Sequence, residues 1–273
     1  MALTSTHYVL PSNESERERL FLQHHHVLKP LFGTALVQPN IYLKPGDKIL
    51  DCGTGSGVWL LDLAESIPPT VLAYGIDIQP RLFPKEPPHN VQLSVNSVTS
   101  LPLEWDNTFV LVHQRLLMAG LRKGEWISAL KEMYRVLAPG GWVQLCECDS
   151  WAAGPAVERE RSLMKALFDS EGLLLDCCQV IPSMLRSAGF TNVHIVEKHL
   201  TLFGEEGAYD RSNSVDVFRA MKTPIMAQGG LGHVVSDEEF DHLVDAVGRE
   251  METTRGSVKR YTVFYAQKPL ASM

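Results

Sequence analysis

Hydrophobic positions follow two spacings that alternate along the chain. Short runs that are almost wholly apolar, such as 70–76 and 109–113, are typical of strands buried on both faces of a sheet. Between them, apolar residues recur every three or four positions, as at Trp126, Leu130 and Met133, which is the spacing of a helix with one buried face. This alternation predicts an α/β fold with a doubly wound, Rossmann-like, mostly parallel sheet of seven strands.

The predicted elements can be placed by residue number. Strands are predicted at 48–52, 70–76, 91–95, 109–113, 142–148, 192–202 and 258–267. Helices are predicted from Ser12 to Pro30, and at 58–66, 123–137, 157–170 and 180–187.

One domain spanning 1–273 is expected, with three parts. An N-terminal arm and helix occupy 1–45, and a core that includes the first five strands occupies 46–150. The segment 204–256, between the last two predicted strands, is far longer than a hairpin connection requires. It contains a helix start at Ser236, where Ser-Asp-Glu-Glu forms a capping box. We expect this insertion to form a helical cap over the carboxyl edge of the sheet.

A glycine-rich turn follows the first strand. Asp51 ends the apolar run, and Gly53, Gly55 and Gly57 follow at alternate positions before a helical pattern begins. Such a strand–turn–helix unit brings backbone N–H groups and a helix N-terminus to a ligand. Asp77 ends the second strand, twenty residues after Gly57, where a carboxylate can accept both hydroxyl groups of a ribose. Together they predict a site for a nucleoside-bearing ligand.

The charge of the turn distinguishes between such ligands. A dinucleotide fingerprint has the spacing Gly-x-Gly-x-x-Gly, whereas this turn has Gly-x-Gly-x-Gly preceded by Asp51. An acidic residue there would repel a pyrophosphate but suits an ammonium or sulfonium group. S-adenosylmethionine carries both of these positive groups together with a ribose, so it is the predicted cofactor.

The same motifs resemble those of a known family. Asp-Cys-Gly-Thr-Gly-Ser-Gly at 51–57, Gly-Ile-Asp-Ile at 75–78 and Arg-Val-Leu-Ala-Pro-Gly-Gly-Trp-Val at 135–143 resemble class I S-adenosylmethionine-dependent methyltransferases. Glu-Arg-Leu-Phe-Leu-Gln-His at 18–24, Gly-Val-Trp-Leu-Leu-Asp-Leu-Ala at 57–64 and Leu-Val-His-Gln-Arg at 111–115 resemble, more narrowly, the fungal methyltransferases related to LaeA. The resemblance covers roughly residues 12–150.

The resemblance implies roles for individual cofactor-binding residues. Gly53, Thr54, Gly55 and Gly57 would hold the amino-acid part of the cofactor, with Asp51 near its ammonium group. Asp77 would bind the ribose, and Ile78 would lie against the adenine. Asn96 or Ser97 stands where the family usually has an acidic residue reaching the adenine amino group, and Asn96 can still accept one hydrogen bond there. Gln23 and His113 would close over the methionine end.

Catalytic residues are harder to infer, because methyl transfer depends more on alignment than on acid–base chemistry. His113 is the first candidate for a general base, since imidazole titrates near neutrality, although it could equally serve only to pack against the cofactor. Glu147, at the end of the fifth strand, is the second. Candidates for the substrate pocket are His26, Trp151, Met164, Phe168, Phe218 and Met221. The apolar members of this set could instead form the core beneath the cap.

Charge and composition limit the classes of partner and the cellular location that we expect. A net charge of −7 and a pI near 5.8, without a basic stripe, argue against nucleic acid, and no apolar run reaches the length of a membrane span. No signal-peptide pattern is present, and five cysteines do not indicate a disulfide framework, so a cytoplasmic protein is expected. No metal is predicted. His24, His25 and His26 are adjacent on a helix and cannot all face one ion.

The sequence therefore predicts an enzyme that transfers a methyl group to a small, apolar secondary metabolite, with O-methylation favoured. Two alternatives remain at this stage. One is a LaeA-like regulatory protein that binds partners, and the other is a catalyst of a ring closure that keeps the cofactor without transferring its methyl group. Neither the acceptor nor the oligomeric state follows from the sequence.

Overall fold

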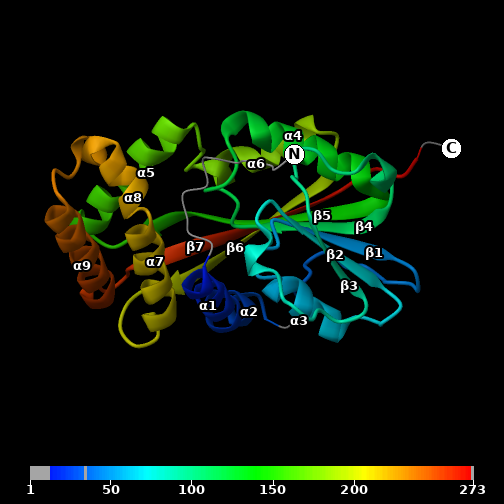
Figure 1. Ribbon diagram of the computed structural model, residues 1–273, viewed down its shortest axis with the longest axis horizontal. Coiled ribbons are helices and arrows are strands. Elements are labelled where there is room, and N and C mark those ends of the chain that lie inside the picture. The colour runs from blue at the N-terminus through cyan, green and yellow to red at the C-terminus, as the bar shows by residue number, and fades with distance from the viewer. Residues whose placement is uncertain (1–12, 34–35, 272–273) are drawn as a thin grey trace.

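The computed structural model describes residues 13–33 and 36–271. A seven-stranded sheet runs through the molecule in the order β3-β2-β1-β4-β5-β7-β6 (Figure 1). β7 is antiparallel to both of its neighbours, and the other adjacent strands are parallel, which confirms the predicted fold class. The strands are β1 Lys48–Cys52, β2 Leu72–Asp77, β3 Val91–Val95, β4 Phe109–Arg115, β5 Leu137–Ala152, β6 Thr191–Thr201 and β7 Val258–Gln267.

Helices cover both faces of the sheet. In Figure 1, α4 and α6 lie above it and α3 lies below it, so each face has its own apolar core. Trp126 and Met133 of α4 are buried on the upper face, and Trp59 and Leu60 of α3 on the lower face. The α-helices are α1 Glu14–Leu22, α2 Lys29–Phe32, α3 Val58–Ser66, α4 Lys123–Val136, α5 Pro155–Glu171, α6 Cys177–Ser187, α7 Ala208–Ala220, α8 Lys222–Ala227 and α9 Asp237–Thr253. Short 3-10 turns occur at η2 Pro80–Leu82, η3 Leu103–Trp105 and η4 Gly229–Gly232, and a π-helical turn occurs at η1 Gln23–Leu28.

The N-terminal helix differs from its prediction at both ends. Ser12, the predicted N-cap, lies outside the described residues, and Asn13 caps α1 by accepting the backbone N–H of Glu16 at 3.0 Å. The predicted stop at Pro30 is wrong, because the chain stays helical to Phe32. The π-helical turn η1 alters the pairing just before the proline, so that the Lys29 N–H donates to the His24 carbonyl group. Pro30 then stands in the first turn of α2, where it lacks an N–H and so donates no hydrogen bond back into η1.

Two strands are longer than the apolar runs indicate. β4 continues two residues beyond His113 to Arg115, and β5 spans Leu137–Ala152 rather than 142–148. Beyond a register shift after Glu147, the carboxyl-terminal extension of β5 is paired with β7, from Ser150 opposite Arg260 to Ala152 opposite Val258. Backbone pairing thus carries the strand past the end of its hydrophobic run, and it brings Trp151 over the carboxyl edge of the sheet.

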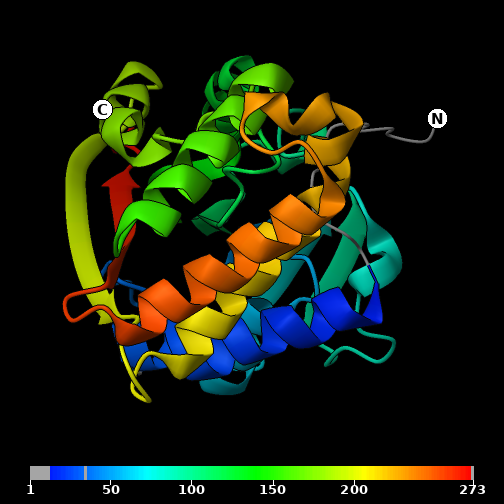
Figure 2. The same ribbon diagram turned by 90° about the vertical axis from the view of Figure 1, so that its left-hand side faces the viewer.

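The segment between β6 and β7 forms helices at one end of the sheet. Because β6 is parallel to β1–β5, the chain leaves it at the edge where the carboxyl ends of those strands lie. Figure 2 shows α7 and α9 lying side by side, with α1 next to α7. The rings of Phe218 and Phe240, 5.0 Å apart, join α7 to α9. Ser236 caps α9 as its motif predicts, accepting the Glu239 backbone N–H at 3.2 Å. These three helices, α7, α8 and α9, are called the cap below.

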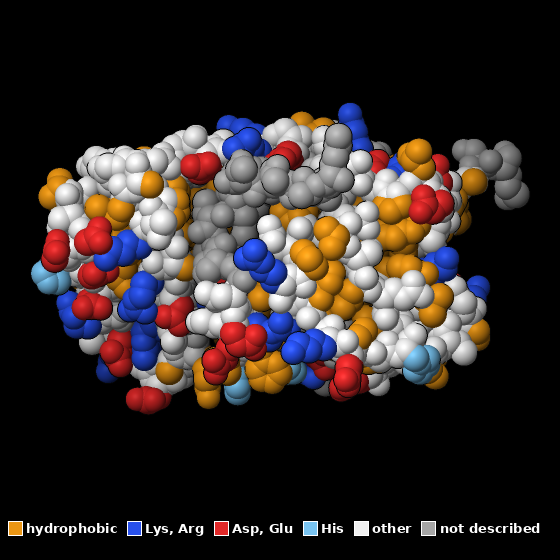
Figure 3. Space-filling view, viewed as in Figure 1, with side chains coloured by type: hydrophobic (Ala, Val, Ile, Leu, Met, Phe, Trp, Pro, Cys, Tyr) orange, Lys and Arg blue, Asp and Glu red, His pale blue; other side chains and the backbone are white. Residues whose placement is uncertain are grey.

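Two features of the structure bear on the predicted partners. Among the residues that the structure describes, no helix is both long and apolar enough to cross a membrane. On the face drawn in Figure 3, acidic and basic side chains are interspersed rather than gathered in a basic stripe.

Candidate active site

The glycine turn after β1 is shaped by backbone hydrogen bonds and left-handed residues. Gly53, Gly55 and Gly57 have φ of 70°, 55° and 75°, a region that residues with a Cβ rarely adopt. The Thr54 N–H donates to the Ile76 carbonyl group at 2.8 Å, and the Gly57 N–H donates to the Thr54 carbonyl group at 2.8 Å. A Cβ on Gly53 would lie 2.7 Å from the side chain of Leu117, so the turn is also packed closely.

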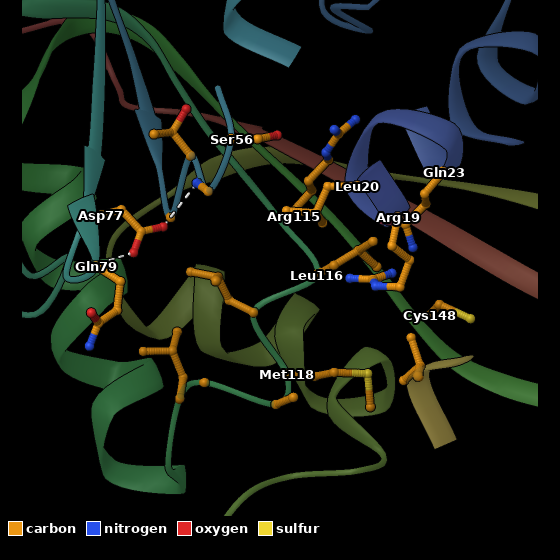
Figure 4. A pocket seen from close by; sticks show the side chains of 18 of the residues that line it. Arg19, Leu20, Gln23, Ser56, Asp77, Gln79, Arg115, Leu116, Met118 and Cys148 are labelled. Carbon is orange, nitrogen blue, oxygen red and sulfur yellow. Dashed lines mark hydrogen bonds between the residues drawn. The ribbon is translucent and has the colours of Figure 1, made fainter. Parts of the chain in front are cut away.

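Asp77 ties the second strand to this turn. Its Oδ2 accepts the Gly55 N–H and its Oδ1 accepts the Gln79 N–H, both at 2.9 Å (Figure 4). Burial raises the pKa of this carboxyl, and the two backbone N–H groups act in the opposite direction. The carboxylate is therefore held in one orientation at the edge of a cavity, where a ribose can be bound.

A single cavity joins this turn to the cap. Figure 4 shows Asp77 and Gln79 on one side of it, and Arg19 and Gln23 from the N-terminal helix on the other. Among the predicted cofactor-binding residues, the structure brings Gln23, Gly53, Thr54, Gly55, Asp77, Ile78, Asn96 and Ser97 to its wall. Asn96 donates to Ser94 Oγ at 2.9 Å, and Ser97 shares a hydrogen bond with Thr99.

The N-terminal helix closes one side of the turn. Leu20 would be 3.3 Å from a Cβ on Gly55, and Arg17 donates to the carbonyl groups of Arg81 and Leu82 at 3.1 and 2.7 Å. On the other side, Arg19 donates to Asn213 Oδ1 of α7 at 2.7 Å. α1 thus connects the turn, the loop after β2 and the cap.

Asp51 and His113 form a buried pair beneath the turn rather than part of the cavity wall. The His113 Nδ1–H donates to Asp51 Oδ1 at 2.7 Å, and Asp51 Oδ2 accepts the Thr54 hydroxyl at 2.6 Å. The imidazole stacks on Trp59, with ring centroids 3.6 Å apart, and is 2% exposed. Burial lowers the pKa of His113. The structure thus places His113 behind the turn, with its Nδ1 engaged, and it does not direct this histidine at an acceptor in the cavity.

Glu147 also lies outside the cavity wall. Its carboxyl accepts the backbone N–H groups of Leu117 at 2.9 Å and Met118 at 3.4 Å, and it is fully buried. Burial raises its pKa to about 8. It fixes the loop after β4, whose residues Leu117 and Met118 do line the cavity.

The three adjacent histidines have separate surroundings. His24 donates from Nε2 to Asp62 at 2.8 Å and accepts from Arg115 at Nδ1 at 2.9 Å, and burial lowers its pKa to about 4. His25 lies against the Phe21 ring, with centroids 4.3 Å apart. His26 stacks on Tyr209 of α7 at 4.2 Å, which places it at the contact between the N-terminal helix and the cap and not on the cavity wall.

Beyond the glycine turn, the cavity becomes largely apolar. Five of the predicted substrate-pocket residues line this part, which is called the acceptor side below: Trp151, Met164, Phe168, Phe218 and Met221. They come from β5, α5 and the region of α7, so segments distant in sequence meet here. Their side chains are also part of the main hydrophobic core, so the two interpretations of these residues are compatible.

Polar groups on the acceptor side were not anticipated from the sequence. Glu160, Lys259 and Tyr261 line the cavity together with Trp151. The Trp151 Nε1–H donates to Glu160 Oε2 at 3.0 Å, and Lys259 Nζ donates to Asp210 Oδ1 at 3.1 Å. Glu160 and Lys259 occupy otherwise unremarkable helix and strand positions. A charged residue on a face that the helical or strand period predicts to be buried is the one signal that could have identified them.

A group of potential metal ligands lies away from the cavity wall. Ligand atoms of Asp149, Cys177 and Cys178 come within 4.8 Å of one another. Asp149 already accepts the Cys178 backbone N–H at 2.8 Å and Arg260 Nη2 at 3.5 Å. These contacts hold the start of α6 against β5.

The residues at the turn fit the predicted cofactor. The left-handed glycines leave no Cβ between the backbone and a ligand, and Asp77 supplies an oriented carboxylate within the same cavity. An apolar wall and a backbone cradle are the usual features of a small-molecule site.

Comparisons with known proteins point to the same chemistry. Residues 49–141 match the family model of a methyltransferase domain. The chain is 30% identical to the N-methyltransferase sirN of Leptosphaeria maculans, with 98% of this chain and 96% of that protein covered. It is 29% identical to the N-methyltransferase verN of Clonostachys rogersoniana, with 96% and 93% covered. The methyltransferase grgD of a Penicillium species is also 29% identical, with 91% of each covered.

Solved structures confirm the fold at lower identity. A phosphoethanolamine N-methyltransferase of Haemonchus contortus, solved with phosphomonomethylethanolamine and S-adenosylhomocysteine, has a TM-score of 0.53 and 16% identity. The match covers 96% of this chain and 54% of that one. The [4+2]-cyclase SpnF has a TM-score of 0.51 and 20% identity, with 84% of this chain and 77% of that one covered.

The full-length match to the fungal enzymes, the methyltransferase domain and the sheet topology agree with one another. S-adenosylmethionine is accordingly the methyl donor. The chain belongs to the class I S-adenosylmethionine-dependent methyltransferases of fungal secondary metabolism.

Proposed function

We propose that this enzyme methylates a nitrogen atom of a small metabolite with an apolar body. The observation that carries the choice of nitrogen is the full-length similarity to relatives named N-methyltransferases, sirN and verN among them. The relatives therefore favour nitrogen over the oxygen acceptor that we expected from the sequence.

In this proposal, one end of the cavity binds the cofactor and the other binds the acceptor. S-adenosylmethionine supplies a methyl group on a positively charged sulfur, and Gly53, Thr54 and Gly55 are our proposed residues for its amino-acid part. Asp77 would accept the ribose hydroxyl groups, and Ile78 would contact the adenine together with Asn96 or Ser97. Gln23 would close the methionine end.

Asp51 and His113 have a different proposed role. Their hydrogen bond at 2.7 Å, and the bond from Thr54 to Asp51, hold the shape of the turn from behind. Glu147 would act in the same indirect way, through the backbone of Leu117. We propose none of these three as the base that accepts a proton from the acceptor.

The acceptor is proposed to bind between the cap and α5. Met164, Phe168, Phe218 and Met221 offer an apolar surface there, and Trp151 adds an aromatic face. Burial of the acceptor against these side chains would exclude water and align the nitrogen with the methyl group, which is the main requirement of the reaction.

The test is to supply methyl-¹³C S-adenosylmethionine and an organic extract of fungal culture to the purified enzyme. The carbon chemical shift of the labelled products then distinguishes N-, O- and C-methyl groups. Label on nitrogen in a small, apolar product is the expected result. Label on oxygen would contradict the proposal. Binding of the cofactor without label transfer to any product would instead favour the regulatory or ring-closing alternatives.

A further inference from the structure

Glu160 is a buried carboxyl that faces the acceptor side of the cavity. It comes from α5 and is 2% exposed, yet it lines the cavity with Met164 and Phe168 of the same helix. Among the described residues, Trp151 Nε1 is the one donor within hydrogen-bond distance of this carboxyl, and it binds Oε2. Oε1 is therefore available to a ligand. A carboxyl placed in an apolar site with one oxygen held and the other available is suited to bind an N–H group.

The other carboxyl groups on the described cavity wall have different tasks. Asp77 accepts the backbone N–H groups of Gly55 and Gln79, at the end proposed to bind the cofactor. Glu125 accepts the Arg122 backbone N–H at 2.8 Å and caps α4. Of the three carboxyl groups among the described residues that line the cavity, Glu160 is therefore the one that lies on the acceptor side.

The charged and titratable groups around Glu160 come from four elements. Lys259 and Tyr261 lie on β7, Arg161 follows Glu160 on α5, Trp151 belongs to β5, and Asp210 lies behind Lys259 on α7. Lys259 Nζ donates to Asp210 Oδ1 and to Ser214 Oγ, at 3.1 and 2.9 Å. Burial, the largest single influence, lowers the pKa of the Lys259 ammonium group, but Asp210, Cys148 and Glu160 together raise it above its ordinary value. Lys259 thus remains protonated and cannot accept a proton near neutral pH.

The pKa of Glu160, unlike that of Lys259, lies near neutral pH. Burial raises its pKa to about 7, while the Trp151 hydrogen bond and the positive charges of Lys259 and Arg161 act in the opposite direction. A group that titrates near the working pH is present partly as its conjugate base and still binds a proton strongly, which is the property of an efficient general base.

We propose that Glu160 binds the N–H group of the acceptor through Oε1 and takes its proton as the methyl group is transferred. The inference rests on the proposed N-methylation. In the step, the nitrogen lone pair forms the new N–C bond, the S–C bond breaks with its electron pair remaining on sulfur, and the N–H proton passes to the Glu160 carboxylate. The products are the N-methyl compound, S-adenosylhomocysteine and protonated Glu160, so atoms and charge balance.

The first test measures binding and does not depend on turnover. Wild type, Glu160→Gln and Glu158→Gln are saturated with S-adenosylhomocysteine and titrated at pH 8 by calorimetry with 2-phenylethylamine and with 2-phenylethanol. The glutamine side chain of Glu160→Gln keeps the shape of the original side chain and can still accept the Trp151 N–H. Glu158 is an exposed residue of the same helix, and its substitution serves as the matched control.

We expect Glu160→Gln to bind 2-phenylethylamine about tenfold more weakly, as for loss of a charge-assisted hydrogen bond. Its affinities for 2-phenylethanol and S-adenosylhomocysteine should stay within about twofold of wild type, as should all affinities of Glu158→Gln. No measurable binding of 2-phenylethylamine to the wild type, or equal binding to Glu160→Gln, would overturn the inference. Unchanged S-adenosylhomocysteine binding also shows that the variant is folded.

The second test follows the rate of ¹³C-methyl incorporation from the fungal extract as a function of pH. The wild-type rate should fall below about pH 7 as Glu160 becomes protonated, and Glu160→Gln should be slower by about 100-fold at pH 8 and lack this fall. Glu160→Asp, which retains a carboxylate, should recover part of the rate. If wild type labels nitrogen and Glu160→Gln does so equally well, only this inference fails. If wild type labels no nitrogen, the proposed function itself fails. Should Glu160→Gln not fold, a wild-type N-methylation rate with no fall near pH 7 is sufficient to refute the role of Glu160.

Discussion

The two ends of the cavity are built in different ways. At the end proposed to bind the cofactor, backbone groups form the wall: the left-handed Gly53 and Gly55, together with the Asp77 carboxylate that the N–H groups of Gly55 and Gln79 orient. On the acceptor side, the surface consists of side chains from β5, α5, α7 and β7. A backbone cradle tolerates few substitutions, because a Cβ alone would obstruct it. A side-chain surface can change with single substitutions while the fold persists. We therefore expect single substitutions on the acceptor side to change which acceptor binds without changing the methyl donor.

The largest expected effect tests whether the cofactor end acts independently. Asp77→Ala should weaken S-adenosylmethionine binding by about 100-fold, or about 3 kcal/mol, because it removes a buried carboxylate that orders the turn and is proposed to bind the ribose. Isothermal titration calorimetry measures this directly. Glu65→Ala, which replaces an exposed acidic residue on α3, is the control and should bind as wild type does.

Affinity for 2-phenylethylamine at saturating S-adenosylhomocysteine should be unchanged in Asp77→Ala. If Asp77→Ala weakened the binding of both S-adenosylmethionine and 2-phenylethylamine, the two ends of the cavity would be coupled, contrary to our interpretation.

The loop that joins the two ends provides the second prediction, through Glu147. Its pKa is about 8 in the folded chain against an ordinary value of 4.5, so between these pH values the folded state binds more protons than the unfolded state. The free energy of unfolding attributable to this group is therefore highest below about pH 4.5 and decreases as the pH rises to about 8. Glu147→Gln removes this dependence.

As the pH rises from 5 to 8, the unfolding free energy of wild type should fall relative to that of Glu147→Gln by about 3 to 4 kcal/mol. Urea denaturation followed by tryptophan fluorescence at several pH values gives the difference. Comparing the two proteins at each pH cancels the other titrating groups, including His24, whose pKa of about 4 makes it act in the opposite direction between pH 4 and 6.5. A difference that does not change with pH would contradict the burial of an ionisable group at this loop.

The smallest expected effect concerns the acceptor side alone. Trp151→Phe retains an aromatic ring but removes the N–H that donates to Glu160 Oε2. Because this hydrogen bond favours the carboxylate, its loss should raise the pKa of Glu160 and move the low-pH fall in N-methylation upward by about 0.7 pH unit, equivalent to about 1 kcal/mol. The pH–rate profile shows the shift, and S-adenosylmethionine affinity should stay unchanged. If the fall in rate moved to lower pH instead, the Trp151 hydrogen bond would not favour the Glu160 carboxylate, and the prediction would be wrong.

The same contrast explains what the sequence could predict. Spacing is sufficient to locate the turn, since Gly53, Gly55 and Gly57 follow a strand and Asp77 ends the next one. Periodicity also indicates the strands and the helices of the core. The ends of the strands are harder to predict from sequence. β5, for example, runs to Ala152 because it pairs with β7, and its own hydrophobic pattern stops earlier.

Residues of the acceptor side could not be assembled from spacing. Trp151, Glu160 and Lys259 are brought together by the order of β5 and β7 in the sheet, which is a long-range property. Conversely, His113 follows a short apolar run at the carboxyl edge, a position typical of catalytic residues, but its ring lies behind the glycine turn and stacks on Trp59. A strand residue can point to either face of a sheet, and its neighbours decide which face is the functional one.

The most direct test of the two-ended cavity is an experimental structure of the complex with S-adenosylhomocysteine. We expect the ribose hydroxyl groups to lie on Asp77, the amino-acid part along Gly53 to Gly55, and the sulfur to be directed toward the space bounded by Trp151 and Glu160. A cofactor bound elsewhere, or a sulfur directed away from Glu160 with the acceptor side filled by protein, would contradict this expectation.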